Sequence, residues 1–199
     1  GIPEKAELIK KLRAQATPII SEIEFASWFT NATIIGITGS NGKTTTTTLV
    51  HNLLVNGGLN AGIAGNIGNS LARLVADENH DYLVVEISSF QLDDILSFKP
   101  HIAILLNISP DHLDRYNYNM DEYVAAKMKI CKNQDANDFL IYMKDDPILA
   151  KEVSKPGVKA KLLPFSTEQV LPEGAYTNTN EEIEITLNNT TIMTIKELS

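Results

Sequence analysis

The chain has 199 residues, 43% of them hydrophobic, which is enough to bury one substantial core, so one main domain is the default expectation. Acidic residues outnumber Lys and Arg by 25 to 17 and give a net charge of -8, which repels a nucleic-acid backbone. The lone cysteine, Cys131, has no intrachain disulfide partner, and the longest apolar runs are too short to span a bilayer. We therefore expect a cytoplasmic protein with neither a nucleic-acid partner nor a membrane partner.

An amphipathic segment precedes the main pattern. Apolar positions among charges predict a short helix over residues 4–13, and an extended stretch at residues 18–20 follows it. Because this αβ pair lies before the alternating strands and helices of the rest of the chain, we assign residues 1–22 to a preceding domain and residues 23–199 to the main domain. The first five residues lack the apolar core of a signal peptide, so we expect the sequence to be a piece of a longer protein.

From residue 33 onward, short β-branched runs alternate with helical segments, which predicts a mainly parallel, doubly wound α/β sheet with helices on both faces. The predicted strands are residues 33–38, 61–64, 81–88, 101–108, 138–143 and 160–165, and the predicted helices are residues 43–56, 69–79, 90–98, 120–133 and 147–153. Near the end, strands at 182–187 and 191–196 flank Asn188-Asn189, a pair that tolerates the positive φ of a tight turn. The sheet should therefore have an antiparallel C-terminal edge.

A glycine-rich loop joins the first strand to the first long helix of this pattern. Its backbone N–H groups and the helix dipole suit phosphate oxygens, with Lys43 on the β and γ phosphates and Thr44 on magnesium. The candidate nucleotide-binding residues are Gly39, Ser40, Asn41, Gly42, Lys43, Thr44 and Thr45. The usual pattern has glycine where Ile37 stands, so this is a variant loop; the alternative is a glycine-rich turn with an exposed lysine. The strand–loop–helix context favours a P-loop-containing fold.

Glu86 ends a run that is apolar enough to be buried on both faces. Ligands of open parallel sheets bind beyond the carboxyl ends of the strands, where a carboxylate can hold Mg²⁺ beside the loop. The alternatives remain open that Glu86 only pairs with a nearby lysine, or that residues 88–91 are only a helix start in which Ser88 and Gln91 form a capping box.

The next strand ends in a polar cluster that contains His112, which can ligate metal or touch an anionic substrate. A single loop histidine is more often a surface residue than a ligand, unless its neighbours complete a site. The surrounding segment, Asn107-Ile108-Ser109-Pro110-Asp111-His112-Leu113-Asp114, supplies such neighbours.

Lys127 lies on a predicted helix with only apolar or aromatic residues at the i±3 and i±4 positions, whereas Lys129 has small or polar neighbours. Burial lowers the pKa of a lysine, and a neutral amine can react with CO₂ to give a carbamate, which is a carboxylate-like metal ligand. The alternative, which the helix pattern alone leaves open, is that Lys127 extends its ammonium group to the surface over an apolar stem.

Taken together, three segments resemble motifs of the Mur ligase family. Residues 38–44 are similar to its TGTNGK[ST] loop, with Ser40 in place of threonine; residues 107–114 are similar to N-x-[ST]-x-D-H-x-D, and residues 125–127 to A-x-K. Further segments resemble the branch of the family that adds D-glutamate: residues 86–92 (E-[LI]-SSFQL), 65–68 (GNIG), 111–116 (DH[LM]DRY) and 1–3 (the end of SPGIP).

The resemblance implies the central domain of an ATP-dependent, ADP-forming ligase that joins D-glutamate to UDP-N-acetylmuramoyl-L-alanine through an acyl phosphate, in peptidoglycan synthesis. It implies ATP and two Mg²⁺ ions, the first held by Thr44 and Glu86 and the second by His112 and carbamylated Lys127. Asn66, Ser88 and His112 would contact the UDP-linked substrate, and residues 1–22 would end a UDP-binding domain.

The family also has a C-terminal D-glutamate-binding domain, which this chain lacks, and a nucleotide-contacting G-x-H-N-x-x-N segment beyond residue 199. We therefore expect the chain alone to be inactive, and the full-length enzyme to be monomeric. Two other functions remain open: folylpolyglutamate synthetase, which shares the loop, and a P-loop ATPase or kinase acting as a binding module, which needs no modified Lys127.

Overall fold

The computed structural model describes residue 2 and residues 6–196 and contains one nine-stranded sheet. The strands lie in the order β2-β3-β1-β4-β5-β6-β7-β8-β9. Neighbours from β2 to β7 are parallel, and β7, β8 and β9 pair antiparallel. The strands are β1 Thr33–Thr38, β2 Ala61–Gly65, β3 Tyr82–Glu86, β4 Ile102–Leu105, β5 Phe139–Met143, β6 Lys161–Ser166, β7 Gly174–Thr177, β8 Ile183–Leu187 and β9 Thr190–Ile195. The predicted α/β class, with its antiparallel C-terminal edge, is confirmed.

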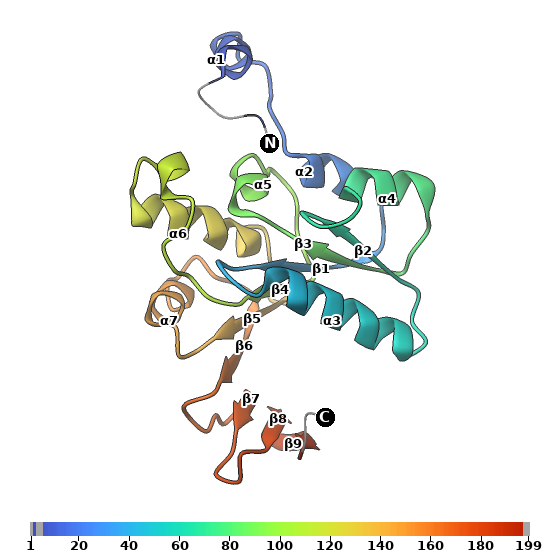
Figure 1. Cartoon of the computed structure of the whole chain (residues 1–199), viewed down its shortest axis with the longest axis vertical. Helices are drawn as coiled ribbons and strands as arrows, with labels where there is room; N and C mark the ends of the chain where they lie inside the picture. The colour runs from blue at the N-terminus through green and yellow to red at the C-terminus, as the bar shows by residue number, and fades with distance from the viewer. Residues whose placement is uncertain (1, 3–5, 197–199) are drawn as a thin grey trace.

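The helices alternate with the parallel strands along the chain (Figure 1). The α-helices are α1 Glu7–Ala14, α2 Glu22–Ser27, α3 Lys43–Asn56, α4 Leu71–Asp77, α5 Ser89–Asp93, α6 Met120–Met128 and α7 Pro147–Val153, and the 3₁₀ turns are η1 Leu113–Tyr116 and η2 Lys129–Cys131. Within the described residues, none of these helices has both the length and the apolar character needed to cross a bilayer.

The direction of the connections changes between β1 and β4, which are neighbours in the sheet. After β1 the chain passes through α3 to β2 at one edge, whereas after β4 it passes through α6 to β5 on the other side. In open α/β sheets the crevice beyond the carboxyl ends of two such strands is the usual ligand site. The loop that follows β1 and the polar segment that follows β4 therefore meet at this crevice.

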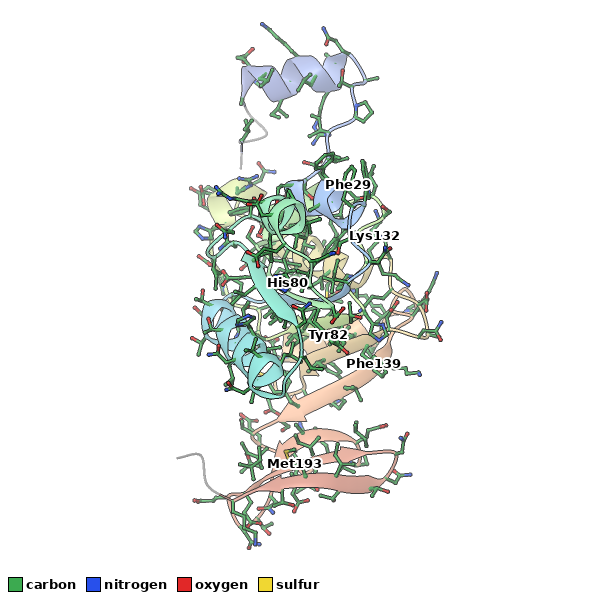
Figure 2. All side chains as sticks on the ribbon, turned by 90° about the vertical axis from the view of Figure 1, so that its right-hand side faces the viewer. Phe29, His80, Tyr82, Lys132, Phe139 and Met193 are labelled. Atoms are coloured by element: carbon green, nitrogen blue, oxygen red, sulfur yellow. The ribbon has the colours of Figure 1, made fainter. Side chains whose placement is uncertain are left out.

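Two apolar clusters lie on opposite faces of the sheet. The smaller one contains Ile35 and Ile37 of β1 and packs against Val50 and Leu54 of α3. The larger one, with 26 buried residues, takes side chains from α2, α4, α5, α6 and α7, so helices cover both faces but unequally. Figure 2 shows side chains packed densely through this body and more sparsely around α1 and around β8–β9, where Met193 lies.

Several predicted elements differ from the observed ones. Residues 18–20 form no strand, so α1 is not followed by a β partner, and the predicted helix 90–98 ends at Asp93. The helix predicted to end at residue 133 changes to a 3₁₀ turn at Lys129, and β7 was not predicted. The cause of the short α5 lies in tertiary structure, because main-chain N–H groups of residues 96–98 bind Glu24 instead of continuing a helix.

Some terminal assignments fall partly outside the described residues. These are the motif at residues 1–3, of which only Ile2 is described, the first two residues of the predicted helix 4–13, and the last three residues of the main domain. Cys131 is buried and free, as its being the lone cysteine requires.

Candidate nucleotide and metal site

The loop between β1 and α3 is shaped by two glycines. Gly42 is the N-cap of α3 and has a φ of 81°, and Gly39 has a φ of 156°, both in a region that L side chains rarely adopt. The 14-residue helix α3 thus begins directly behind the loop, with its N-terminal N–H groups and positive dipole end directed at it. The geometry is that of an anion-binding turn.

The segment after β4 holds the loop in place. The Asn107 side chain accepts from the Asn41 N–H at 2.9 Å and donates to the Asn41 carbonyl at 3.1 Å. Ser40 Oγ lies 2.9 Å from Tyr123 Oη and accepts from the Ser109 N–H at 2.9 Å. These bonds join residues more than 60 positions apart, so the loop conformation is fixed by the fold rather than by local sequence.

Lys43, the first residue of α3, lies across the loop. Its Nζ donates to the Gly39 carbonyl at 2.9 Å and to the Ser40 carbonyl at 2.8 Å. Thr44 is exposed at the same helix end, and Thr45 is exposed on the first turn as well. Lys43, Thr44 and Thr45, three of the candidate nucleotide-binding residues, are therefore grouped at one helix N-terminus.

Glu86 ends β3 and is only 2% exposed, yet both of its carboxylate oxygens have partners. Thr44 Oγ1 donates to Glu86 Oε2 at 2.7 Å, and Asn66 Nδ2 donates to Glu86 Oε1 at 3.0 Å. Gly65 is required beside it, because a Cβ there would lie 2.1 Å from the Glu86 carbonyl oxygen. The alternative in which Glu86 pairs with a lysine is wrong: the donors are a hydroxyl and an amide.

Lys127 lies on the inner side of α6 and is 2% exposed. Its Nζ donates to the Gly39 carbonyl at 2.8 Å and lies 4.8 Å from the Tyr123 ring centroid. Burial, and secondarily the nearby charge of Lys43, lower the pKa of Lys127 to about 8. The inward orientation is confirmed, and the alternative of an ammonium group at the surface is wrong.

One small cavity, of about 140 Å³, gathers most of these side chains. Its lining residues are Lys43, Asn66, Ser88, Ser89, Phe90, Asp111, His112, Tyr123 and Lys127. His112 is the most peripheral of the predicted residues: its side chain is 63% exposed, with Nε2 3.6 Å from Asp111 Oδ1 and its ring 5.6 Å from that of Phe90. The structure thus brings the helix with Lys127 and the loop with His112 to the phosphate loop, and Glu86 joins them through Thr44 and Asn66.

Residues 37–198 match the family model described as the Mur ligase middle domain. The chain belongs to the Mur ligase family. A relative from Christiangramia forsetii, named "UDP-N-acetylmuramoylalanine--D-glutamate ligase", is 55% identical over 190 residues, which are 96% of this chain and 42% of the relative. A relative of the same name from Bacteroides fragilis is 53% identical over 92% of this chain and 41% of its own length. The Mur ligase chain therefore spans about two fifths of the length of these relatives.

Among solved structures, the Mur ligase chain is similar to the MurF ligase of Thermotoga maritima in complex with ADP. The two share 27% sequence identity with a TM-score of 0.64, over 82% of this chain and 40% of that one. The structural similarity supports the mainly parallel sheet and the loop-to-helix arrangement described above.

The donor set of this Mur ligase site fits magnesium. Thr44 Oγ1 and Glu86 Oε2 are hard oxygen donors 2.7 Å apart beside the loop. In the described part of the chain no three His, Cys, Asp or Glu side chains gather into a metal cluster. Magnesium typically takes one or two protein oxygens and completes its shell with water and substrate phosphate, so two adjacent oxygens at a phosphate loop are sufficient.

Several residues of this site have contacts that the sequence does not predict. Tyr123 lies four residues before Lys127, and that spacing predicts only that its ring lies beside the lysine. In the structure its hydroxyl also contacts Ser40 of the loop. Asp111 lies in the recognised polar segment and lines the cavity. The capping box at Ser88 and Gln91 is present, with the Ser88 N–H donating to Gln91 Oε1 at 3.0 Å, and Ser88 also lines the cavity. Capping and ligand contact are therefore compatible at Ser88.

Proposed function

We propose that this chain is the central ATP-binding domain of a ligase that joins D-glutamate to UDP-N-acetylmuramoyl-L-alanine, with release of ADP and phosphate, in cytoplasmic peptidoglycan synthesis. The observation that carries the proposal is the convergence of three segments on one phosphate loop: the end of β3, the segment after β4, and α6. The relatives named for this activity are 55% and 53% identical over almost the whole chain.

Each residue of the loop has a role in this proposal. Backbone N–H groups at the start of α3, those of Gly42, Lys43 and Thr44, would cradle the ATP phosphates, because the Ser40 and Asn41 N–H groups already donate to Asn107. The Lys43 amine would leave its two carbonyl partners to meet the β and γ phosphates. Thr44 and Glu86 would hold one Mg²⁺, which offsets charge on the transferred phosphoryl group when bound. Thr45, which is exposed on the first turn of α3, would also contact the nucleotide.

Lys127 is proposed to act as a carbamate. The lone pair of the neutral amine forms a bond to the carbon of CO₂, one C=O π pair becomes charge on oxygen, and one N–H proton passes to water. A pKa of about 8 makes the neutral amine accessible near neutral pH. Together with His112, the new carboxylate would hold a second Mg²⁺.

The reaction proposed here begins with transfer of the γ-phosphoryl group to the alanyl carboxylate, which gives an acyl phosphate. The amine of D-glutamate then attacks the acyl carbon, the amide bond forms, and phosphate leaves. Asn66, Ser88 and His112 line one cavity with Lys43 and Lys127, and we propose that they orient the UDP-linked substrate.

The domain organisation belongs to the same proposal. Residues 1–22 would end a UDP-binding domain, residues 23–199 would form the central domain, and a D-glutamate-binding domain would follow. The relatives are more than twice as long as this chain, which is compatible with such flanking domains. The full-length enzyme would act as a monomer.

The test is an assay of phosphate release by the full-length enzyme with ATP, Mg²⁺ and UDP-N-acetylmuramoyl-L-alanine. We expect release to depend on D-glutamate and to fall at least a hundredfold in Lys43→Ala, because the transferred phosphate loses its cationic contact, roughly 3 kcal/mol of transition-state stabilisation. Lys10→Ala, which removes an exposed lysine paired with Glu7, is the matched control and should retain activity. Phosphate release that is indifferent to D-glutamate would refute the proposal.

Two other functions make different predictions. A folylpolyglutamate synthetase would turn over a pteridine substrate, and a P-loop ATPase or kinase acting as a binding module would hydrolyse ATP with an unmodified Lys127. The burial of Lys127 against the loop carbonyl favours a role for this amine and therefore disfavours the binding module.

A further inference from the structure

Three buried side-chain atoms in the described part of the chain have no hydrogen-bond partner: Thr38 Oγ1, Thr47 Oγ1 and Gln134 Oε1. Thr38 is fully buried and is the last residue of β1, directly before the phosphate loop. A buried hydroxyl without a partner destabilises a fold, and in native structures such groups call for an explanation, one of which is an ion or ligand absent from the structure.

The side chain of Thr38 lies on the face of β1 that α6 covers. Side chains alternate along a strand, and Ile35 and Ile37 belong to the smaller cluster under α3. Ile34, Gly36 and Thr38 therefore share the opposite face. Ile34 belongs to the larger cluster, which includes Tyr123, Val124 and Ala126 of α6.

The same helix, α6, brings the Lys127 amine into contact with Gly39, the residue that follows Thr38. Lys127 Nζ donates to the Gly39 carbonyl at 2.8 Å, and consecutive Cα atoms are about 3.8 Å apart. The unpartnered hydroxyl and the buried amine thus lie on one side of the sheet, at adjacent positions of the backbone.

We propose that the Thr38 hydroxyl is the partner of the carbamate on Lys127, and that Thr38 is a positioning residue of this site. The inference rests on the proposed carbamylation of Lys127. A carbamate nitrogen keeps one N–H, so it can still donate to the Gly39 carbonyl, while its carboxylate accepts from Thr38 Oγ1. The hydroxyl would then stabilise the modified lysine and orient its carboxylate, which would leave the other carbamate oxygen available to a Mg²⁺ ion.

Carbamylation also improves the charge balance of the site. Two amines, Lys43 and Lys127, now donate to one carbonyl oxygen, that of Gly39, which brings two cationic groups close together. The carbamate replaces one cation by an anion beside Lys43. The Thr38 hydroxyl, neutral and already buried, satisfies this anion without requiring a further charge.

The test measures carbamate formation directly in the full-length protein, by the NMR signal of ¹³C-bicarbonate incorporated at a lysine, over a bicarbonate titration with Mg²⁺ present. Lys127→Arg identifies the signal, because arginine forms no such carbamate. We expect Thr38→Val to need roughly tenfold more bicarbonate than the unaltered protein, since one hydrogen bond to a charged group is lost. Thr38→Ser keeps the hydroxyl, so carbamate formation in this variant should need about the same bicarbonate concentration as in the unaltered protein.

Thr47→Val is the matched control. Thr47 is equally buried and equally without a partner, but it lies on α3 at the other face of the sheet, so the bicarbonate titration of Thr47→Val should match that of the unaltered protein.

Both valine variants should keep or raise the urea midpoint, because each removes an unsatisfied hydroxyl. If Thr38→Val misfolds, Thr38→Ala replaces it. If Thr38→Val, or Thr38→Ala in its place, forms the carbamate at the same bicarbonate concentration as the unaltered protein, the role of Thr38 is overturned, while the carbamate itself is not. The absence of any Lys127-dependent signal would overturn the carbamate and this inference together, while leaving the D-glutamate assay as a separate test of the ligase.

Discussion

At the scale of single residues, a buried carboxylate is stabilised by hydrogen bonds from main-chain N–H groups. The Glu24 carboxylate of α2 is fully buried and accepts from the N–H groups of Leu96, Ser97 and Phe98 and from the Trp28 ring nitrogen. Burial alone would raise the pKa of Glu24, but the bonds from Ser97, Phe98 and Leu96 outweigh it and lower the pKa to about 2. This carboxylate anchors α2 to the turn before β4.

We expect Glu24→Gln to destabilise the protein by about 2 kcal/mol at pH 7, because a neutral amide binds these donors less strongly and leaves some of them unpaired. The folded pKa lies below the usual 4.5, so this stabilisation is complete above pH 4.5 and is lost as the pH falls toward 2. Urea unfolding should therefore show a difference between the two proteins that shrinks across this interval.

Glu7→Gln is the control for this measurement, since Glu7 is exposed and, within the described residues, its ion pair is with the exposed Lys10. Its effect should be a few tenths of a kcal/mol at most. A Glu24→Gln difference that stays constant from pH 7 to pH 2 would show that the charge of Glu24 is not what stabilises the turn.

The sequence allowed some of these residue-scale features to be predicted. The apolar neighbours of Lys127 on its own helix indicated an inward amine, because that pattern is local. Its acceptor, Gly39, is 88 positions away, and the contacts of Glu24 with residues 96–98 span more than 70 positions, so neither could be read from spacing. Glu24 itself resembled any acidic residue in the first turn of a helix.

At the scale of elements, the β8–β9 hairpin shows a turn that sequence chemistry predicts well. Asn188 and Asn189 have φ values of 51° and 59°, and Leu187 pairs with Thr190, which defines a two-residue loop with both φ angles positive. Asparagine tolerates this conformation, and glycine at the second position favours it further.

We expect Asn189→Gly to stabilise the hairpin by about 0.5 kcal/mol, because glycine adopts the positive φ at lower cost. Amide hydrogen exchange in β9 should slow about twofold. Asn189→Ala, whose side chain disfavours positive φ, should speed it instead. Faster exchange in the glycine variant would contradict the assigned turn.

Element boundaries were predicted less well where tertiary contacts decide them. The helix α3 contains five consecutive threonines, a poor helical sequence, yet it runs without interruption from Lys43 to Asn56 because one face packs on the sheet. The short α5 depends on Glu24, which is distant in the chain, so its local sequence gave no adequate signal. The strand β7 has only four residues and pairs with β6 at only two positions, which leaves too short a pattern to predict it.

At the scale of the whole molecule, the candidate site lies beyond the carboxyl ends of the interior strands β3, β1 and β4. Relatives of this chain are more than twice its length, and a ligase must bring three substrates together. We expect residues 1–199 alone to show no ligation with ATP, UDP-N-acetylmuramoyl-L-alanine and D-glutamate, because positioning supplies much of the rate. A D-glutamate-dependent phosphate assay on the isolated chain, beside the full-length enzyme, checks this; measurable ligation by the chain would contradict it.

The most direct test of the central claim is a crystal structure of the full-length protein with a non-hydrolysable ATP analogue, Mg²⁺ and bicarbonate. We predict phosphate density against the N–H groups of Gly42, Lys43 and Thr44, a Mg²⁺ ion bound by Thr44 and Glu86, and additional density of a carbamate on Lys127 facing a second ion near His112. Triphosphate bound elsewhere, with Lys127 still a free amine on the Gly39 carbonyl, would contradict the account.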